Sequence, residues 1–266
     1  MILITGATDG IGLETAKELA LRGHALVLHG RNEEKARHAR EAVLHKAPDA
    51  EVHFAIADLS DLAAVARMAR ELSGRLPRLD ALVNNAGVYM LKRALSRDGA
   101  EMTIAVNHLA HFLLTGLLLP LLKKSPDPRV VTVSSVAHMS GRIEFDNLNG
   151  ERSFDAYHAY ANSKLANALF SFELARREPR ISANCLHPGV IDTKLLHAGF
   201  NMTGSPVTEG ARTSVYLASS PQVKGVTGKY FDRCVSVAPS PLAQDPQLAR
   251  KLWEWSERAV LRYAAE

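Results

Sequence analysis

Cysteine is scarce in this 266-residue sequence, and the scarcity narrows the kind of protein it encodes. Cys185 and Cys234 are too few for a disulfide framework, and they do not have the spacing of metal ligands. Free thiols are typical of proteins in reducing compartments. We therefore expect a cytoplasmic protein with no metal site.

The excess of positive charge is also small. Thirty-two Lys and Arg residues against 28 Asp and Glu give a net charge of +4, and the two signs are interspersed along the chain. Without a basic block, nucleic acid is not an expected partner. With 47% hydrophobic and 23% charged residues, the composition excludes collagen-like, low-complexity and globally disordered proteins.

Long hydrophobic runs are missing as well. The longest candidate, 109–122, is shorter than the roughly 20 residues of a membrane-spanning helix and contains His111 and Pro120. It predicts a buried helix, and no transmembrane segment is expected. Residues 1–5 already have the pattern of a strand, which leaves no room for a signal peptide before it.

Apolar runs of strand length alternate with segments of helical period, which is typical of βα units around a parallel sheet. The expected strands are 2–5, 25–29, 52–57, 81–84, 130–134, 182–187 and 228–231. The expected helices are 11–22, 33–46, 62–75, 99–124, 157–177 and 207–219, with Asp61, Asp98 and Thr208 as candidate N-caps. No linker divides the sequence, so we expect a single α/β domain over 1–266.

Two polar, irregular segments near 137–156 and 189–206 each follow an expected strand. Ligands of open α/β sheets bind beyond the carboxyl ends of the strands, so these segments are predicted to be substrate loops. Apolar residues there and nearby predict a mainly apolar pocket, with core or dimer packing as the alternative: Tyr89, Met90, His138, Met139, Leu195, Leu196, Phe200 and Met202.

The segment 5–12, with sequence TGATDGIG, lies between the first expected strand and the first expected helix. Glycine permits a tight turn, and the N–H groups at the start of a helix attract a diphosphate. A dinucleotide site is therefore predicted here. Its residues are Gly6, Thr8, Asp9, Gly10, Ile11 and Gly12.

The end of the second strand indicates which dinucleotide is bound. A cofactor with a free ribose 2′-hydroxyl requires a carboxylate at this place, which Gly30 cannot supply. Arg31, followed by Asn32, offers a guanidinium group suited to a 2′-phosphate. NADP is therefore predicted in preference to NAD.

Two further strand ends carry candidate cofactor contacts. After the third strand, Asp58 could accept a hydrogen bond from the adenine amino group while Leu59 packs on the ring, although Asp58 could equally be a helix cap. After the fourth strand, Asn85, Ala86 and Gly87 are small and polar residues that suit a close passage of the backbone beside a cofactor.

Tyr160 and Lys164 are four residues apart, on one face of an expected helix. A nearby cation favours the anion of a tyrosine, which makes acid–base chemistry possible; a surface pair is the alternative. Tyr157 has Ala161 at the corresponding position and so no such partner. Two further polar candidates are Ser135, at the end of the fifth strand, and Asn107, in the long helix.

Taken in order, these segments resemble the short-chain dehydrogenases/reductases over nearly the whole chain. The matching positions are 5–12, 58–59, 84–87, Asn107, Ser135, Tyr160-x-x-x-Lys164 and Pro188-Gly189-x-x-x-Thr193. The resemblance implies a Rossmann-type doubly wound fold, with a central parallel sheet of about seven strands and helices on both faces.

The resemblance also implies a catalytic tetrad of Asn107, Ser135, Tyr160 and Lys164. In that family the tyrosine exchanges a proton with the substrate oxygen, and the serine hydrogen-bonds to the same oxygen. The lysine lowers the pKa of the tyrosine and holds the nicotinamide ribose, while the asparagine positions a water of the proton relay. The residues implied to line the nicotinamide are Pro188, Gly189, Ile191 and Thr193.

Within the family, the sequence is most similar to the retinol dehydrogenase-like branch, at 107–115, 133–138, 160–167 and 252–256. It departs from the membrane-bound members in showing no amino-terminal hydrophobic anchor. His108 and His111 have no third ligand at suitable spacing, so they are predicted to be helix residues. The run 112–122 is compatible with the helix pairing by which family members form dimers or tetramers, and core packing explains it equally.

The sequence therefore predicts an NADP(H)-dependent oxidoreductase that transfers a hydride between nicotinamide and a carbonyl or alcohol substrate. Two alternatives stay open. One is a catalytically silent dinucleotide-binding sensor, which would bind NADPH without consuming it. The other is an NADP-dependent reductase of a conjugated C=C bond, which product analysis would distinguish.

Overall fold

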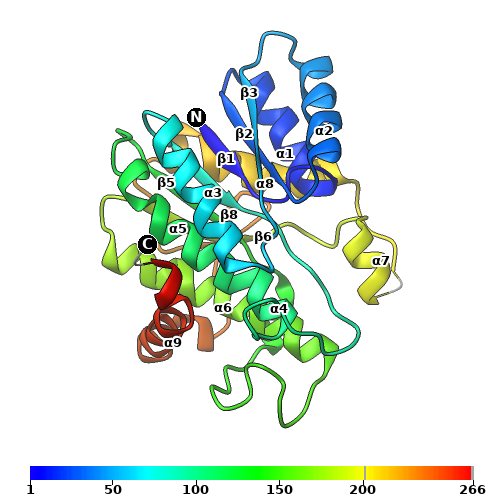
Figure 1. Ribbon diagram of the computed structural model, residues 1–266, viewed down its shortest axis with the longest axis vertical. Coiled ribbons are helices and arrows are strands. Elements are labelled where there is room, and N and C mark those ends of the chain that lie inside the picture. Colours follow the sequence, from blue (N-terminus) through cyan, green and yellow to red (C-terminus); the bar gives the residue numbers. More distant parts are fainter. Residues whose placement is uncertain (201, 265–266) are drawn as a thin grey trace.

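The computed structural model describes residues 1–200 and 202–264 and has one eight-stranded sheet (Figure 1). The order across the sheet is β3-β2-β1-β4-β5-β6-β7-β8. The strands are β1 Ile2–Ile4, β2 Leu26–Gly30, β3 Val52–Ile56, β4 Ala81–Asn84, β5 Arg129–Val133, β6 Ser182–His187, β7 Tyr230–Asp232 and β8 Val235–Val237. The first seven are parallel, and the doubly wound architecture is confirmed.

The eighth strand was not expected from the sequence. Arg233 and Cys234 both adopt positive φ angles, 48° and 64°, which reverse the chain so that β8 runs antiparallel to β7. All three residues of β8 are exposed. Three residues are too few to distinguish a strand by apolar alternation, and β8 has no buried face.

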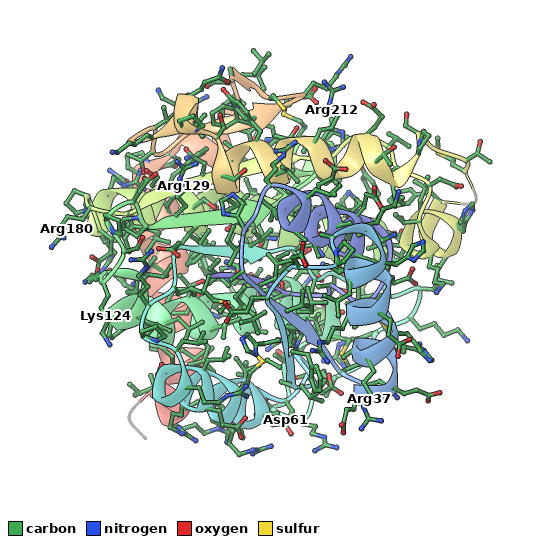
Figure 2. The ribbon with its side chains drawn as sticks, turned by 90° about the horizontal axis from the view of Figure 1, so that it is seen from above. Arg37, Asp61, Lys124, Arg129, Arg180 and Arg212 are labelled. Carbon is green, nitrogen blue, oxygen red and sulfur yellow. The ribbon has the colours of Figure 1, made fainter. Side chains whose placement is uncertain are left out.

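Helices cover both faces of the sheet. They are α1 Gly10–Leu21, α2 Glu33–Lys46, α3 Leu62–Arg75, α4 Met102–Ile104, α5 Ala110–Leu122, α6 Ala156–Arg177, α7 Lys194–Phe200, α8 Val207–Ser219 and α9 Pro246–Ala264. Strand residues alternate between two cores: Ile2 and Ile4 pack against α1, α2 and α8, and Leu3 packs against α3 and α5. In Figure 2 the sheet lies between these layers, with Arg37, Lys124 and Arg212 at the outside.

The expected N-cap of α3 is confirmed, because the Asp61 carboxylate accepts a hydrogen bond from Ala64 N at 3.0 Å. Asp98 and Thr208 were wrong as caps. The α4 helix begins after Glu101, whose buried carboxylate accepts from Thr103 N and Ile104 N, and α8 begins after Pro206.

Asp98 instead joins two helices that are distant in sequence. Its carboxylate accepts from Leu62 N (2.9 Å) at the start of α3, and from the side chains of Arg262 and Tyr263 on α9. The α9 helix, which was not among the expected helices, closes the molecule beside α3, α5 and α6. Its Trp253 ring contacts Phe112, with centroids 4.8 Å apart, so core packing accounts for this end of the 112–122 run.

The expected helix at 99–124 begins later and is not uniform. It comprises α4, a π-helical turn at Ala105–Leu109, and α5. The combined segment Met102–Leu122 is long and apolar enough to span a membrane, which the shorter run 109–122 did not suggest. However, 78% of its apolar window is buried inside the protein, which is how a core helix of the same composition behaves.

Candidate active site

The carboxyl ends of β1, β4, β5 and β6 meet at one edge of the sheet, where the strand order reverses between β1 and β4. Ligands of doubly wound sheets bind at this reversal. The glycine-rich segment follows β1, residues 84–87 end β4, Ser135 follows β5, and Pro188 follows β6. The fold therefore brings most of the expected site residues to this edge of the sheet, where β1, β5 and β6 are labelled in Figure 1.

The glycine-rich segment folds as it does because Gly6 and Gly12 occupy positions where a side chain would not fit. Gly6 has φ +64°, and a Cβ on Gly12 would lie 2.2 Å from the carbonyl oxygen of Gly6. The following residues open α1, whose first N–H groups have no acceptor within the helix. This cradle fits a diphosphate, which is an observation independent of the sequence motif.

The cradle is fastened to β4 through Thr5. The Thr5 hydroxyl accepts hydrogen bonds from Asn85 N (2.8 Å) and Ala86 N (3.0 Å). The Asn85 amide donates to the carbonyl of Thr5 at 2.8 Å. His29 holds the other side, since its Nδ1 accepts from Gly6 N at 3.2 Å. Sequence reasoning missed Thr5 and His29, although both are polar residues in otherwise apolar strands.

The expected 2′-phosphate contact lies at the end of β2. A Cβ on Gly30 would lie 2.5 Å from the Thr8 methyl group, so the two segments cross closely here. Arg31 is exposed at this corner, and the Asn32 carbonyl oxygen Oδ1 caps α2 by accepting from Lys35 N at 2.9 Å. The corner therefore presents an exposed guanidinium side chain beside the cradle.

Asp58 and Leu59 both make contacts within the protein. Asp58 accepts from both the N–H and the hydroxyl of Ser60, at 2.9 and 2.8 Å. Burial raises the pKa of Asp58, but these hydrogen bonds together with Arg31 and Arg97 outweigh it, so the net pKa is lowered. Leu59 is 5% exposed and packs in the core, which leaves little of it to stack on a base.

Tyr160, Lys164 and Ser135 come together beside residues 84–87. Tyr160 is 7% exposed, and the Lys164 ammonium lies 5.5 Å from the centroid of its ring. Lys164 donates to the carbonyl of Val133 at 3.0 Å. A Cβ on Gly87 would lie 3.5 Å from the Lys164 Nζ, so the loop that follows β4 (residues 85–87, the β4 loop) passes directly over the Lys164 ammonium.

The electrostatics of this group differ from those that the resemblance implied. Burial raises the pKa of Tyr160 to about 12, and the Ser135 hydroxyl only partly offsets that rise. Burial likewise lowers the pKa of Lys164 to about 8, because an ammonium in the protein interior is poorly solvated. The expected lowering of the tyrosine pKa by the lysine is therefore not what this structure shows, and the phenol is protonated at neutral pH.

Asn107 lies in the π-helical turn, with its side chain on the β4 loop. Its Oδ1 accepts from Val88 N (2.8 Å), and its Nδ2 donates to Ser163 Oγ (2.9 Å). The carbonyl oxygen of Asn107 accepts from His111 Nδ1 (3.0 Å), whose Nε2 lies 2.9 Å from the Thr5 hydroxyl. A carbonyl oxygen has two lone pairs, so one of them is engaged by His111. Sequence reasoning missed this link between Asn107 and the glycine-rich segment.

The segment after β6 returns to the glycine-rich segment. Gly189 has φ +99°, and Ile191 is buried against Gly210 of α8. The Thr193 methyl group lies 3.7 Å from where a Cβ of Gly10 would be, so the two expected cofactor segments meet. Beside them Lys194 forms an ion pair with Asp9, a cation that the sequence did not reveal because the two residues are 185 positions apart.

The α7 helix covers Tyr160 with apolar groups. Phe200 contacts the rings of Tyr89 and Tyr160, with centroids 5.0 and 6.1 Å apart, and Leu195 packs in the same cluster. A Cβ on Gly199 would lie 2.9 Å from the Tyr89 ring, so glycine lets α7 approach this closely. Among the other apolar residues named from the sequence, Met139 and Met202 are exposed, while His138 is buried.

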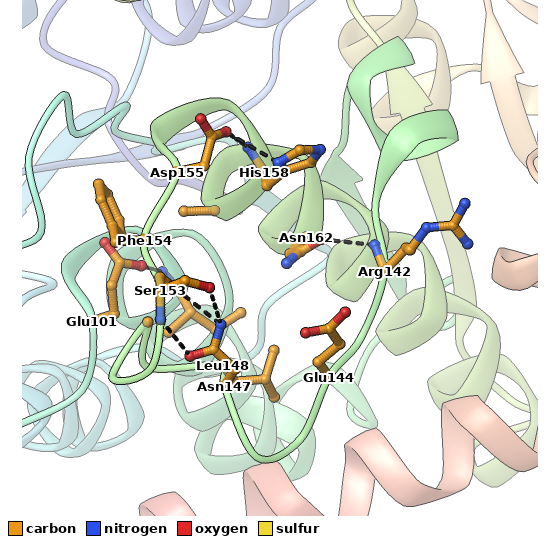
Figure 3. A pocket seen from close by; sticks show the side chains of 13 residues that line it. Glu101, Arg142, Glu144, Asn147, Leu148, Ser153, Phe154, Asp155, His158 and Asn162 are labelled. Atoms are coloured by element: carbon orange, nitrogen blue, oxygen red, sulfur yellow. Dashed lines mark hydrogen bonds and ion pairs between the residues drawn. The ribbon is translucent and has the colours of Figure 1, made fainter.

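A separate cavity of about 320 Å³ lies near the start of α6 (Figure 3). Its lining includes Glu101, Phe154 and Asn162, but none of the four expected catalytic residues. Some of its polar groups have partners: Figure 3 shows Asp155 beside His158, and the Asn162 side chain accepts from Arg142 N at 2.7 Å.

Comparison with known proteins agrees with this geometry. The family model described as short chain dehydrogenase matches residues 1–203. Human retinol dehydrogenase 14 is 41% identical, with 97% of this chain and 85% of that protein covered. Human retinol dehydrogenase 13 is 40% identical over 97% and 84%, and the chloroplastic short-chain dehydrogenase TIC 32 B of Brassica napus is 38% identical over 97% and 88%.

Solved structures give the same result. An uncharacterised protein from Mycobacterium paratuberculosis superposes with a TM-score of 0.82 at 35% identity, covering 98% of this chain and 92% of that one. A short chain dehydrogenase from Shigella flexneri complexed with NADP has a TM-score of 0.74 at 28% identity, covering 88% and 96%. From its sequence, fold and site, the chain is an oxidoreductase that belongs to the short-chain dehydrogenase/reductase family, in the retinol dehydrogenase-like branch.

Proposed function

We propose that this protein is an NADP(H)-dependent oxidoreductase that transfers a hydride between nicotinamide and an apolar carbonyl or alcohol. The observation that carries the proposal is the buried phenol of Tyr160, which lies beside Ser135 and Lys164 under the apolar side chains of α7. The whole of 1–266 acts as one catalytic domain, with 137–156 and 189–206 as its substrate loops.

When bound, the nicotinamide would supply or accept the hydride. Tyr160 exchanges the accompanying proton with the substrate oxygen, which the Ser135 hydroxyl also holds. Since burial raises the pKa of Tyr160 to about 12, the phenol carries its proton at neutral pH and suits the donation step of carbonyl reduction. Lys164 holds the nicotinamide ribose, and Asn107 positions the water that returns a proton to the site.

The remaining proposed contacts are with the other parts of NADP. The cradle of Gly6 and Gly12 admits the diphosphate, and Arg31 holds the 2′-phosphate of NADP. Residues 85–87 pass beside the nicotinamide ribose, and residues 188–193 line the nicotinamide. Complexes of related short chain dehydrogenases with NADP and NADPH support this choice of cofactor.

The substrate is apolar because its walls are apolar. Tyr89, Leu195 and Phe200 surround the Tyr160 ring, and Met139 and Met202 are exposed nearby in the two proposed substrate loops. The names of the retinol dehydrogenases with about 40% identity favour an apolar alcohol or its aldehyde.

The acid–base role is tested by Tyr160→Phe, which removes only the phenolic hydroxyl. We expect the turnover of NADPH with a panel of apolar aldehydes and ketones to fall by roughly 10²–10⁴-fold, with NADPH binding retained. Tyr157→Phe, one turn earlier on α6, is the matched control and should leave turnover unchanged. Substantial turnover by Tyr160→Phe would refute the role.

The two alternative functions are tested on the wild-type protein. If it binds NADPH but consumes none with any substrate, a sensor is favoured. If the product has a reduced C=C bond, an enone reductase is favoured.

The cofactor preference is tested by Arg31→Ala. Loss of a charge-assisted hydrogen bond should weaken NADPH binding roughly 10- to 100-fold and leave NADH binding nearly unchanged. Arg37→Ala, which removes an exposed guanidinium paired with Glu33 on α2, is the control. Dissociation constants come from titration of cofactor fluorescence, and equal losses for both cofactors would remove the 2′-phosphate argument.

A further inference from the structure

The peptide group that joins Ser135 to Val136 is held at both of its polar atoms by imidazole side chains. The Ser135 carbonyl lies 2.7 Å from Nδ1 of His138, within the 3-10 turn Val136–Ser140. The Val136 N–H donates to Nδ1 of His187 at 3.1 Å. Two histidines 49 positions apart in sequence therefore hold one peptide unit, the one that follows the proposed catalytic serine.

Backbone chemistry fixes the tautomer of each ring. A carbonyl oxygen only accepts, so His138 carries its proton on Nδ1, and its Nε2 accepts from Ser240 N at 3.0 Å. A backbone N–H only donates, so His187 presents a lone pair at Nδ1 and carries its proton on Nε2. The two neutral histidines are thus required in opposite tautomers.

The surroundings keep both rings neutral. His138 is 2% exposed and lies against the Tyr230 ring, with centroids 4.6 Å apart, and burial lowers its pKa. Burial also lowers the pKa of His187, and Arg233 and His138 act in the same direction. Asp232, its register partner on β7, opposes them without reversing the shift.

We propose that His138 and His187 are positioning residues that fix the Ser135 hydroxyl relative to the nicotinamide. The inference rests on the proposed role of Ser135. His187 directly precedes Pro188 and Gly189, so its hydrogen bond joins the serine segment to the segment proposed to line the nicotinamide. His138 in turn ties the serine segment to Ser240, in the polypeptide that leads to α9.

The arrangement gives a signature that depends on pH. Protonation of His187 removes the lone pair that accepts from Val136. The peptide group after Ser135 then loses the hydrogen bond at its N–H, while the Ser135 carbonyl keeps those from Nδ1 and the backbone N–H of His138. Because the pKa of His187 is lowered from its ordinary value, this loss occurs only on the acid side of about 6.5. We therefore expect an acid limb in the pH dependence of kcat that belongs to His187.

Substitutions at His187 separate positioning from mere packing. His187→Leu keeps the bulk but removes the acceptor, and should lower kcat roughly tenfold while NADPH affinity is retained. His187→Asn supplies an amide oxygen near the place of Nδ1, and should restore kcat without the acid limb. His53→Asn, on the edge strand β3, is the control. A His187→Leu variant with wild-type kcat, or a His187→Asn variant that keeps the acid limb, would overturn the proposal.

A second measurement does not depend on turnover. The ¹⁵N chemical shifts of the imidazoles in the wild-type protein report the tautomers directly, with assignments from the variants His138→Asn and His187→Asn. We expect the Nδ1–H form for His138 and the Nε2–H form for His187. If either ring adopts the other tautomer, the two-histidine arrangement is wrong, whatever the enzyme does. If the tautomers are as expected but no carbonyl is reduced, the arrangement stands and the proposed function fails.

Discussion

Glycine is required at Gly12 of the nucleotide cradle but not at Gly74 of α3. A Cβ on Gly12 would meet the Gly6 carbonyl oxygen at 2.2 Å and the Asn85 amide at 2.6 Å, whereas a Cβ on Gly74 of α3 would meet nothing within 4 Å. The first clash involves backbone that β1 and β4 hold in place, so it cannot be relieved by rotating a side chain.

We accordingly expect Gly12→Ala to lower the free energy of unfolding by about 1–3 kcal/mol and to abolish measurable NADPH binding. Gly74→Ala should raise the free energy of unfolding by up to about 1 kcal/mol, because alanine favours a helix interior. Urea denaturation and cofactor titration measure both quantities. A Gly12→Ala protein that binds NADPH normally would show that the cradle is not the diphosphate site.

At the scale of single residues, sequence reasoning reached the side chains that lie in local motifs and missed those that act across the chain. The spacing around Gly6 and Gly12 predicted a cradle, and the structure has one. The contacts of His29 and His111 with the glycine-rich segment were not predicted, because their partners are 23 and 106 positions away. Contacts of that separation leave no periodic pattern in the sequence.

At the scale of elements, the glycine-rich segment and α7 are joined by charge. Asp9 caps α1 by accepting from Gly10 N (2.8 Å) and pairs with Lys194 at the start of α7. The hydrogen bond from Lys194 is the largest single cause of the lowered pKa of Asp9, although burial partly opposes it. A carboxylate at a diphosphate site is repulsive unless a cation accompanies it, and Lys194 supplies that cation.

Lys194→Ala should therefore weaken NADPH binding several-fold at low salt, and less as salt screens the exposed charges. Adding Asp9→Asn, which keeps an oxygen for the Gly10 N–H, should recover part of the affinity. Lys123→Ala, at the end of α5, is the control. Titrations at two ionic strengths decide the matter, and a Lys194→Ala loss that Asp9→Asn deepens would contradict this account.

Element boundaries were predictable where apolar period and capping agreed, as at Asp61 before α3. The α7 helix was not predicted, because seven residues containing Gly199 are too few to show a period. The strongly amphipathic α9 was not predicted either, although its apolar stripe, which includes Leu252 and Val260, repeats with a helical period in the sequence.

At the scale of the whole molecule, buried neutral histidines link stability to pH. Burial lowers the pKa of His108 and His111 to about 3, and that of His29 to about 4. In the unfolded chain these groups bind protons near pH 6.5, while in the folded protein they do not. The unfolded state therefore gains protons first as the pH falls, and stability decreases with it.

Between about pH 6 and 4.5, each such histidine should remove about 1.4 kcal/mol of unfolding free energy per pH unit. His108→Gln should reduce that slope by about one proton, while the exposed His45→Gln should not. Urea unfolding at several pH values gives the slopes. An unchanged slope in His108→Gln would mean that the imidazole already takes up its proton in the folded state.

The overall architecture was the most predictable level. Alternating strand and helix periods predicted the seven parallel strands, because each strand is buried between two helix layers and must be apolar. The order of the strands was available only through the family resemblance. The exposed β8, which satisfies no such burial requirement, could not be predicted from either.

The π-helical turn at Ala105–Leu109 contains one residue more than a regular helical turn would hold. Deleting any single residue there would restore the regular helix and rotate the preceding residues by about 100° relative to those that follow. Asn107 would then lose its hydrogen bonds to Val88 and Ser163. A one-residue deletion, which a surface loop can accommodate, would therefore disrupt the site when it falls in this turn. Sequence alignments of related proteins should accordingly show no gaps at these positions.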